Sequence, residues 1–324
     1  TPEALDLMKQ VSDFRRNGAR SLVMEVSSHA LEQHRADGVR FQVGVFTNLT
    51  PEHLDYHLDM ESYFTSKSHL FRELLPRDSG RAVINVDDVY GRRLAAMLPS
   101  ALTCGRSEDA DIHPESVEIS LSGIRGSVAT PLGTVAVDSP LLGDFNVENL
   151  LCAIGAAVAL HVSPREIAAG INAARGVPGR LEQVENDRGA VILVDYAHTG
   201  DALRRVLEAL QKLSPQRILT LFGCGGDRDR SKRPIMAEVA ACSSDIAIAT
   251  SDNPRSEDPW QILADVRIGL ERVHAGELSR ADAMAGSGRG YIIIEDRREA
   301  LGFAVSLLRP GDLLLVAGKG HEDY

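Results

Sequence analysis

The sequence predicts an α/β protein with two domains, each built on a mostly parallel sheet. Apolar runs of strand length alternate with segments that have the apolar spacing of helices, which is typical of parallel sheets. The 324 residues exceed the usual size of one domain. The turn-forming run Gly176-Val177-Pro178-Gly179 divides them into expected domains 1–176 and 177–324, of which the second is doubly wound.

The first domain begins with a helical pattern over 4–16. Strands are expected at 20–26, 41–47 and 81–86, and helices at 60–75, 87–98 and 146–161. Short alternating runs within 109–138, separated by Gly, Ser and Pro, predict a small antiparallel insert. Ser163-Pro164 is a start signal for one more helix.

In the second domain the alternation is regular, which predicts a doubly wound sheet. Strands are expected at 190–196, 217–223, 246–250, 290–295 and 312–317. Helices are expected between them at 200–213, 234–242, 258–272 and 297–308.

Composition narrows the class of protein. Apolar residues make up 44% and charged residues 25%, as in an ordinary globular chain with a sizeable core. Lys plus Arg (35) minus Asp plus Glu (46) gives −11, a charge that disfavours binding to nucleic acid or to an anionic membrane. No apolar run is long enough to span a bilayer, and no signal peptide is recognisable. Four scattered cysteines without a C-x-x-C pair fit reduced thiols in a cytosol.

Polar residues gather after the expected strands, where open α/β sheets bind ligands. Glu25 ends the first strand and either binds a cation or belongs to an ordinary helix cap at Ser27. After the next strand, His53, Asp55 and His57 would share one face if the segment is extended, which permits a metal site. A polar loop is the plainer interpretation. Lys67, on the following helix, is by composition alone a solvated surface charge.

Further polar positions favour a nucleotide-sized ligand. Asn146 and Asn149 are three apart, so they share a helix face, and an amide could bind a purine edge. Arg180 follows the domain boundary. Asp195 ends a strand, which suits a ribose contact, a metal contact or a helix cap.

The segment Gly223–Pro234 carries the strongest signal. Its glycines allow close backbone approach to a ligand, and its basic residues can clamp carboxylates or phosphates. It is not a P-loop, because G-x-x-x-x-G-K-[ST] occurs nowhere in the chain. Asp252-Asn253-Pro254-Arg255 and Gly318–Tyr324 also follow strands, and each alone could be a simple turn.

Together these segments resemble the Mur ligases of peptidoglycan synthesis, in particular the branch that adds meso-diaminopimelate. The resemblance covers essentially the whole chain and is carried by Met24–His29, Asn48-Leu49 with His53–His57, Asp195–Thr199, Gly223–Pro234, Asp252–Arg255 and Gly318–Tyr324. It implies a central ATP-binding domain and a C-terminal amino-acid-binding domain. The implied reaction is ATP-dependent amide formation through an acyl phosphate, with magnesium to offset phosphate charge.

The resemblance also implies roles for individual residues. The family's contacts to UDP-N-acetylmuramoyl-L-alanyl-D-glutamate fall on Thr1, Ser27, Gln33 and Arg35. Its magnesium ligands and catalytic residues fall on Glu25, His53 and Lys67, and Lys67 would be carbamylated to bind a second magnesium. Its ATP contacts fall on Asn149, Arg180 and Asp195.

The same resemblance implies a site for the incoming amino acid, formed by Arg228, Asp252, Asn253, Pro254, Arg255, Gly318 and Glu322. Diaminopimelate differs from lysine by one extra carboxylate, and the guanidinium of Arg255 can bind that group in a fork. We expect a monomer in the cytoplasm, with no nucleic-acid partner and no membrane insertion.

The sequence departs from the family pattern at both ends. The nucleotide-sugar domain and the phosphate loop expected before Thr1 are not in the sequence, nor is a tail after Tyr324. We therefore expect a chain truncated at both ends that forms no amide by itself. The alternatives are a folylpolyglutamate synthase-like ligase, a metallohydrolase that uses His53, Asp55 and His57, and a non-catalytic binding protein.

Overall fold

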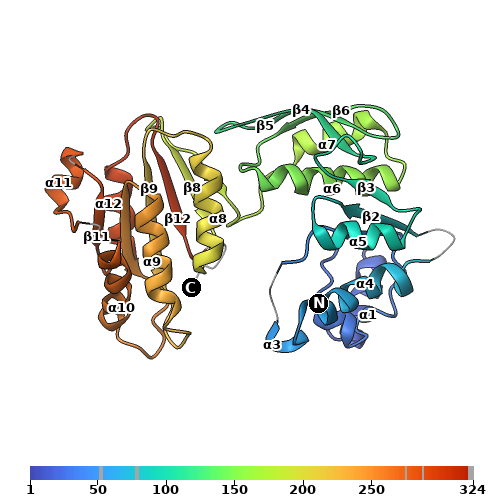
Figure 1. Ribbon diagram of the computed structural model, residues 1–324, viewed down its shortest axis with the longest axis horizontal. Helices are drawn as coiled ribbons and strands as arrows, with labels where there is room; N and C mark the ends of the chain where they lie inside the picture. The colour runs from blue at the N-terminus through green and yellow to red at the C-terminus, as the bar shows by residue number, and fades with distance from the viewer. Residues whose placement is uncertain (51–53, 77–79, 274–275, 287, 320–324) are drawn as a thin grey trace. The chain divides into compact units, whose positions relative to one another are not determined.

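The computed structural model describes residues 1–50, 54–76, 80–273, 276–286 and 288–319 (Figure 1). Contacts divide the chain into two compact units. The first comprises Thr1–Glu118, Ile124–Ser139 and Phe145–Ala173. The second comprises the residues from Ala174 onward together with two short segments, Ile119–Gly123 and Pro140–Asp144.

The first unit holds a parallel sheet of order β1-β2-β3, made of β1 (Val43–Phe46), β2 (Arg81–Asn85) and β3 (Leu102–Cys104). The apolar helix α6 (Phe145–Ala159) packs on this sheet, and Val147, Leu151 and Ile154 are buried there. Its other helices are α1 (Ala4–Arg16), α2 (Ser28–Glu32), α3 (Leu54–His57), α4 (Met60–His69), the π-helical turn η1 (Leu70–Leu74) and α5 (Val89–Met97).

The expected antiparallel insert is confirmed. It is a sheet of order β4-β5-β6, formed by β4 (His113–Ser120), β5 (Gly123–Ala129) and β6 (Val135–Ser139), and β5 pairs antiparallel with β6. Helix α7 (Pro164–Ala173) packs on β6. It begins at the expected signal, where Ser163 and Glu166 hydrogen-bond each other's side chain and backbone as a capping box.

The second unit is the expected doubly wound domain. Its sheet order is β11-β10-β9-β12-β8-β7, with β7 (Glu182–Val184), β8 (Val191–Asp195), β9 (Ile218–Cys224), β10 (Ile246–Ser251), β11 (Gly290–Ile293) and β12 (Leu313–Ala317). The short edge strand β7 runs antiparallel to β8, and the other described pairings are parallel.

Helices cover both faces of this sheet (Figure 1). They are α8 (Gly200–Gln211), α9 (Lys232–Ser243), α10 (Pro259–Arg272), α11 (Arg280–Ala285) and α12 (Arg297–Ser306). Leu203 of α8, Met236 of α9 and Ile262 of α10 pack with Phe222 on one face. Successive strand residues point to opposite faces, so Leu221 packs instead with Ala300 of α12.

One strand prediction is wrong. Residues 20–26 form no strand, and Val23 is 96% exposed. Strand β1 lies at the edge of its sheet and pairs with β2, and residues 20–26 do not pair with its open edge. An apolar run becomes a buried strand only where a neighbour takes up its backbone hydrogen bonds.

Within the described residues, no helix combines the length and the apolar composition that a bilayer crossing requires.

Candidate functional site

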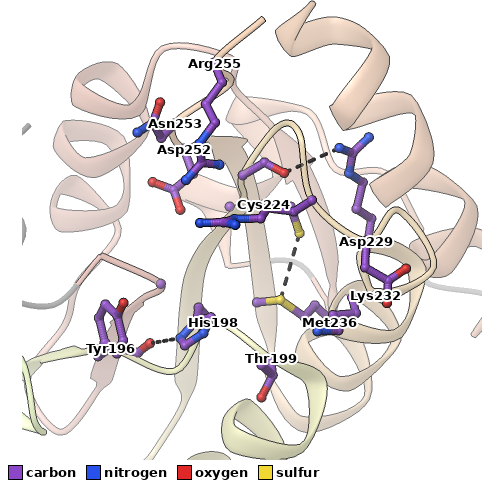
Figure 2. A pocket seen from close by; sticks show the side chains of 15 residues that line it. Tyr196, His198, Thr199, Cys224, Asp229, Lys232, Met236, Asp252, Asn253 and Arg255 are labelled. Carbon is purple, nitrogen blue, oxygen red and sulfur yellow. Dashed lines mark hydrogen bonds between the residues drawn. The ribbon is translucent and has the colours of Figure 1, made fainter. Parts of the chain in front are cut away.

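A pocket of about 400 Å³ opens at the carboxyl ends of β8, β9, β10 and β12 in the second unit (Figure 2). It is lined by Tyr196, His198, Thr199, Gly223, Cys224, Gly225, Arg228, Asp229, Lys232, Arg233, Met236, Asp252, Asn253, Arg255 and Gly318. Five residues of the predicted amino-acid site are in this lining: Arg228, Asp252, Asn253, Arg255 and Gly318. The fold therefore brings together residues up to 90 positions apart in the chain, at the expected edge of the sheet.

Gly226, which follows β9, is required because the loop after β10 approaches it closely. A Cβ on Gly226 would lie 1.8 Å from the carbonyl oxygen of Pro254, a distance no side chain tolerates. The N–H of Gly226 donates to the carbonyl oxygen of Asn253 at 2.9 Å. Pro254 does not line the pocket, and its backbone instead forms this close contact. The two loops are thus held together through main-chain atoms.

Arg255 sits at the tip of the second loop with φ of +51°, in the left-handed region. One guanidinium nitrogen donates to the carbonyl oxygen of Gly226 at 2.5 Å. Asp227 accepts from the hydroxyl of Ser256 at 2.7 Å and from its N–H at 3.1 Å, and these bonds lower the pKa of Asp227. Arg255 is exposed, and the hydrogen bonds around Gly226 and Ser256 fix its loop. The other N–H donors of its guanidinium stay available to a ligand.

Arg233 does not join the expected basic clamp. It is 1% exposed and donates to Glu257 at 2.6 and 3.0 Å and to Asp265 at 2.8 Å. Glu257 also accepts the N–H of Asp227 at 2.6 Å, and these bonds lower the pKa of Glu257 to about 2. The hypothesis that this run clamps carboxylates or phosphates therefore depends on exposed members such as Arg228 and not on Arg233. Glu257 and Asp265 bind Arg233 in the interior. Both lie beyond residue 255, so the sequence of Gly223–Pro234 alone does not predict this pairing.

The remaining lining has two further features. Gly318 adopts φ of +102°, and a Cβ there would lie 3.6 Å from a carboxylate oxygen of Asp252, so glycine leaves this corner open. Burial raises the pKa of the Cys224 thiol to about 12, which disfavours its nucleophilic thiolate form. Glu322, the last predicted member of the site, lies outside the described residues.

Tyr196 and His198 form another side of the pocket (Figure 2). They belong to Asp195–Thr199, a segment that carries the family resemblance, but only Asp195 of that segment was predicted to bind a ligand. Nδ1 of His198 lies 3.0 Å from the carbonyl oxygen of Tyr196, and the guanidinium of Arg180 lies 5.1 Å from the Tyr196 ring centre. Asp195 directly before them is 6% exposed and accepts the N–H groups of Leu181 at 2.9 Å and Ala197 at 2.8 Å. Both of its oxygens accept backbone N–H groups that lie outside helices, and Thr199 is the residue that caps α8, so the helix-cap alternative for Asp195 is wrong.

In the first unit, the predicted nucleotide-substrate residues lie together. The hydroxyl of Thr1 donates to the carbonyl oxygen of Glu25 and accepts the N–H of Ser27, each at 3.1 Å. Arg35 donates to the carbonyl oxygen of Thr1 at 3.4 Å and to the side chain of Gln33. Four positions spread over 35 residues thus form one partly exposed polar surface. The Ser27 hydroxyl also caps α2 by accepting the N–H of Ala30 at 3.2 Å.

A shared metal face of His53, Asp55 and His57 required an extended segment, and that condition is not met in its described part. The backbone of Leu54–His57 is helical. His57 is buried, hydrogen-bonded to Ser28 at 2.8 Å and stacked on Tyr63. His53 itself lies outside the described residues. The metallohydrolase alternative thereby loses its geometric support.

Lys67 and Asn149 occupy helical positions in this unit. Lys67 is half-buried on α4, with its Nζ 5.5 Å from the ring centre of Tyr63. Asn149 is exposed near the start of α6 and donates to the side chain of Asn146 at 2.8 Å, as their shared helix face predicts. Glu25 is exposed as well. Their roles in binding magnesium and ATP stay predictions.

Comparison with known proteins decides the family. Residues 1–157 match the Mur ligase middle domain, and residues 179–320 match the Mur ligase, glutamate ligase domain. The chain belongs to the Mur ligase family. It is 52% identical over 330 residues to a UDP-N-acetylmuramoyl-L-alanyl-D-glutamate--2,6-diaminopimelate ligase of Geobacter metallireducens. The alignment covers all of this chain and 65% of that relative, so the chain spans about two thirds of the relative's length.

Solved structures agree with this membership. A structure of a UDP-N-acetylmuramoyl-L-alanyl-D-glutamate--2,6-diaminopimelate ligase superposes with a TM-score of 0.72 at 36% identity, covering 100% of this chain and 64% of that one. Folylpolyglutamate synthase of Mycobacterium tuberculosis superposes with a TM-score of 0.63 at 18% identity, covering 88% of this chain and 62% of that one. The second likeness shows a shared fold only.

Proposed function

We propose that the protein carrying this Mur ligase chain joins meso-diaminopimelate to UDP-N-acetylmuramoyl-L-alanyl-D-glutamate at the expense of ATP. The observation that carries the proposal is the pocket in which Arg228 and Arg255 lie with Asp252 and Asn253. The relative that is 52% identical is named as a ligase of UDP-N-acetylmuramoyl-L-alanyl-D-glutamate and 2,6-diaminopimelate, which supports the proposal.

The pocket has the charges that a diamino dicarboxylic acid needs. A guanidinium binds a carboxylate through two parallel hydrogen bonds, and the lining offers two exposed guanidinium groups, Arg228 and Arg255. The carboxylate of Asp252 and the amide of Asn253 can accept hydrogen bonds from an ammonium group. Lysine has one carboxylate fewer, so it would leave one guanidinium without its partner.

The reaction needs an activated carboxylate, because a carboxylate anion is a poor electrophile. The γ-phosphate of ATP passes to the D-glutamyl side-chain carboxylate, ADP leaves, and an acyl phosphate forms. The lone pair of the diaminopimelate amine attacks the acyl carbon, the amine loses a proton, and phosphate departs. In this scheme Thr1, Ser27, Gln33 and Arg35 hold the nucleotide-linked substrate in place for attack.

We propose that three residues bind ATP. The amide of Asn149 offers a donor and an acceptor to the adenine edge. The guanidinium of Arg180, which is exposed and lies over the face of Tyr196, would bind phosphate. Asp195 would accept from the ribose hydroxyls with lone pairs that its two backbone bonds leave available.

Magnesium is the metal that this scheme implies. The carboxylate of Glu25 and the carbamate that Lys67 would carry offer oxygen ligands, which magnesium prefers, and His53 would add a nitrogen. Carbamylation requires the neutral amine of Lys67. Magnesium would offset the charge of the phosphates. We place the reaction in the cytoplasm, where ATP is available, and propose that the protein acts as a monomer.

The test is product formation by the protein at its natural length. It is incubated with ATP, magnesium and UDP-N-acetylmuramoyl-L-alanyl-D-glutamate, and either meso-diaminopimelate or lysine is added. We expect phosphate release and a product of the mass of the amide with diaminopimelate, and little with lysine. Equal product from both amino acids, or none from either, would refute the proposal.

A further inference from the structure

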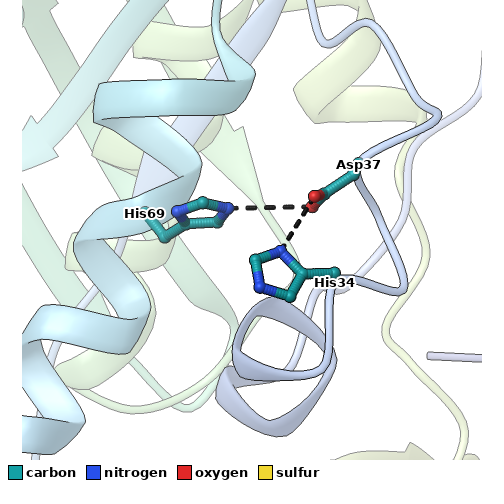
Figure 3. A group of neighbouring side chains, drawn as sticks. All are labelled: His34, Asp37 and His69. Carbon is teal, nitrogen blue, oxygen red and sulfur yellow. Dashed lines mark hydrogen bonds and ion pairs between the residues drawn. The ribbon is translucent and has the colours of Figure 1, made fainter.

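We propose that His34, Asp37 and His69 form a binding site for a zinc-like divalent metal ion in the first unit (Figure 3). One ligand atom of each residue lies within 4.8 Å of the other two. None of the three belongs to the predicted magnesium set of Glu25, His53 and Lys67.

The three side chains come from two elements. His34 and Asp37 belong to the turn that follows α2, and His69 is the last residue of α4. Nδ1 of His34 lies 2.9 Å from one oxygen of Asp37, and Nε2 of His69 lies 3.7 Å from the other. Figure 3 shows both rings turned toward this carboxylate. The site would therefore link the turn after α2 to the helix that carries Lys67.

The spacing suits a tetrahedral ion. Zinc holds His nitrogen and carboxylate oxygen at roughly 2.0–2.2 Å, which places ligand atoms of a tetrahedron roughly 3.3–3.5 Å apart. The 2.9 and 3.7 Å separations lie on either side of that value. Small side-chain rotations would thus seat the ion on three protein ligands and leave a fourth position for water. Two imidazoles with one carboxylate suit zinc and its neighbours in the first transition row better than magnesium.

His69 supplies the second observation. Its Nε2 is shielded from solvent and has no hydrogen-bond partner among the described residues. A shielded polar atom without a partner is costly, and 3.7 Å is too long for a hydrogen bond to Asp37. A metal ion between these two atoms would satisfy both.

His34 has a left-handed backbone conformation, which is unfavourable for histidine. After α2, the N–H of His34 bonds to Leu31 and the N–H of Arg35 bonds to Ala30, which makes His34 the left-handed residue of a Schellman motif, with φ of +56°. Glycine or asparagine is favoured at such a position. His161 after α6 occupies the same motif with φ of +58° and belongs to no such cluster in the described part of the chain. It is therefore a matched control.

The experiment is calorimetric titration of Zn²⁺ into the metal-stripped 324-residue chain at neutral pH, with excess Mg²⁺ throughout to fill sites that prefer oxygen ligands. Wild type is compared with His34→Asn, Asp37→Asn, His69→Gln and the control His161→Asn. Asn suits the left-handed position, so His34→Asn keeps the fold even if the half-buried His69 variant is less stable. Circular dichroism verifies folding of each variant.

We expect wild type and His161→Asn to bind one more Zn²⁺ than the other three variants, or to bind it about tenfold or more tightly. Zn²⁺ should also raise the thermal midpoint of wild type more than that of His34→Asn. The proposal is overturned if wild type does not bind Zn²⁺, if all variants bind it equally, or if His161→Asn loses as much as His34→Asn. None of these results bears on the ligase proposal, since no ligase substrate is present.

Discussion

At the residue scale, Arg255 is the side chain on which substrate choice depends. Replacing it with alanine removes a guanidinium that would bind the second carboxylate of diaminopimelate. A hydrogen bond to a charged group contributes about 1.5–3 kcal/mol, so kcat/KM for diaminopimelate should fall roughly 10- to 100-fold, and that for lysine much less. Steady-state kinetics of the full-length protein measures both. Arg272→Ala, at an exposed arginine paired with Glu238, is the matched control, and equal losses for both amino acids would contradict the assignment.

A second residue-scale prediction concerns Glu257, whose pKa is lowered to about 2 chiefly by hydrogen bonds from Arg233. A lowered folded-state pKa stabilises the fold above the unfolded value, near 4.5, and this stabilisation is lost as the pH falls toward 2. Glu257→Gln should therefore be less stable at neutral pH and lose less stability on acidification. Urea midpoints followed by fluorescence of the single tryptophan, Trp260 on α10, test this. Parallel pH profiles for the two proteins would rule it out.

At the element scale, the pocket depends on two loops that touch through their backbones. Gly226→Ala would force a Cβ to 1.8 Å from the Pro254 carbonyl oxygen, so the loops must separate. We expect diaminopimelate binding to weaken by about tenfold or more, because Arg255 donates to Gly226 and would shift with it. Gly302→Ala, on α12 with open space around it, is the control and should leave binding unchanged. Calorimetry gives both affinities, and wild-type affinity in Gly226→Ala would show that the loop contact is dispensable.

At the element scale, the strands also differ in how well the sequence predicts them. Strands β8, β9, β10 and β12 were predictable because each is an apolar run of strand length bounded by polar residues. The edge strand β7 and the three-residue β3 were not, since they are too short for a pattern. Residues 20–26 had the pattern but pair with no strand. For the site, strand ends located the lining residues, whereas the inward turn of Arg233 depends on Glu257 and Asp265 and needed coordinates.

At the scale of the whole molecule, the second unit takes part of its core from a segment that precedes α6. Leu142 is 1% exposed and packs in the cluster that contains Leu203 and Phe222. Leu142→Ala should therefore destabilise the second unit by about 2–5 kcal/mol. Trp260 fluorescence reports that unit. Leu94→Ala, which removes an equally buried leucine from the core of the first unit, should shift the Trp260 transition less, and an equal shift would contradict the division.

The central claim is that the pocket at the strand ends of the second unit binds a diamino dicarboxylic acid. Calorimetric titration of the 324-residue chain with meso-diaminopimelate, and separately with lysine, tests it without requiring turnover. Because lysine lacks the second carboxylate, we predict one binding site for meso-diaminopimelate, with lysine roughly tenfold or more weaker. Absence of binding, or equal affinity for the two amino acids, would contradict the account.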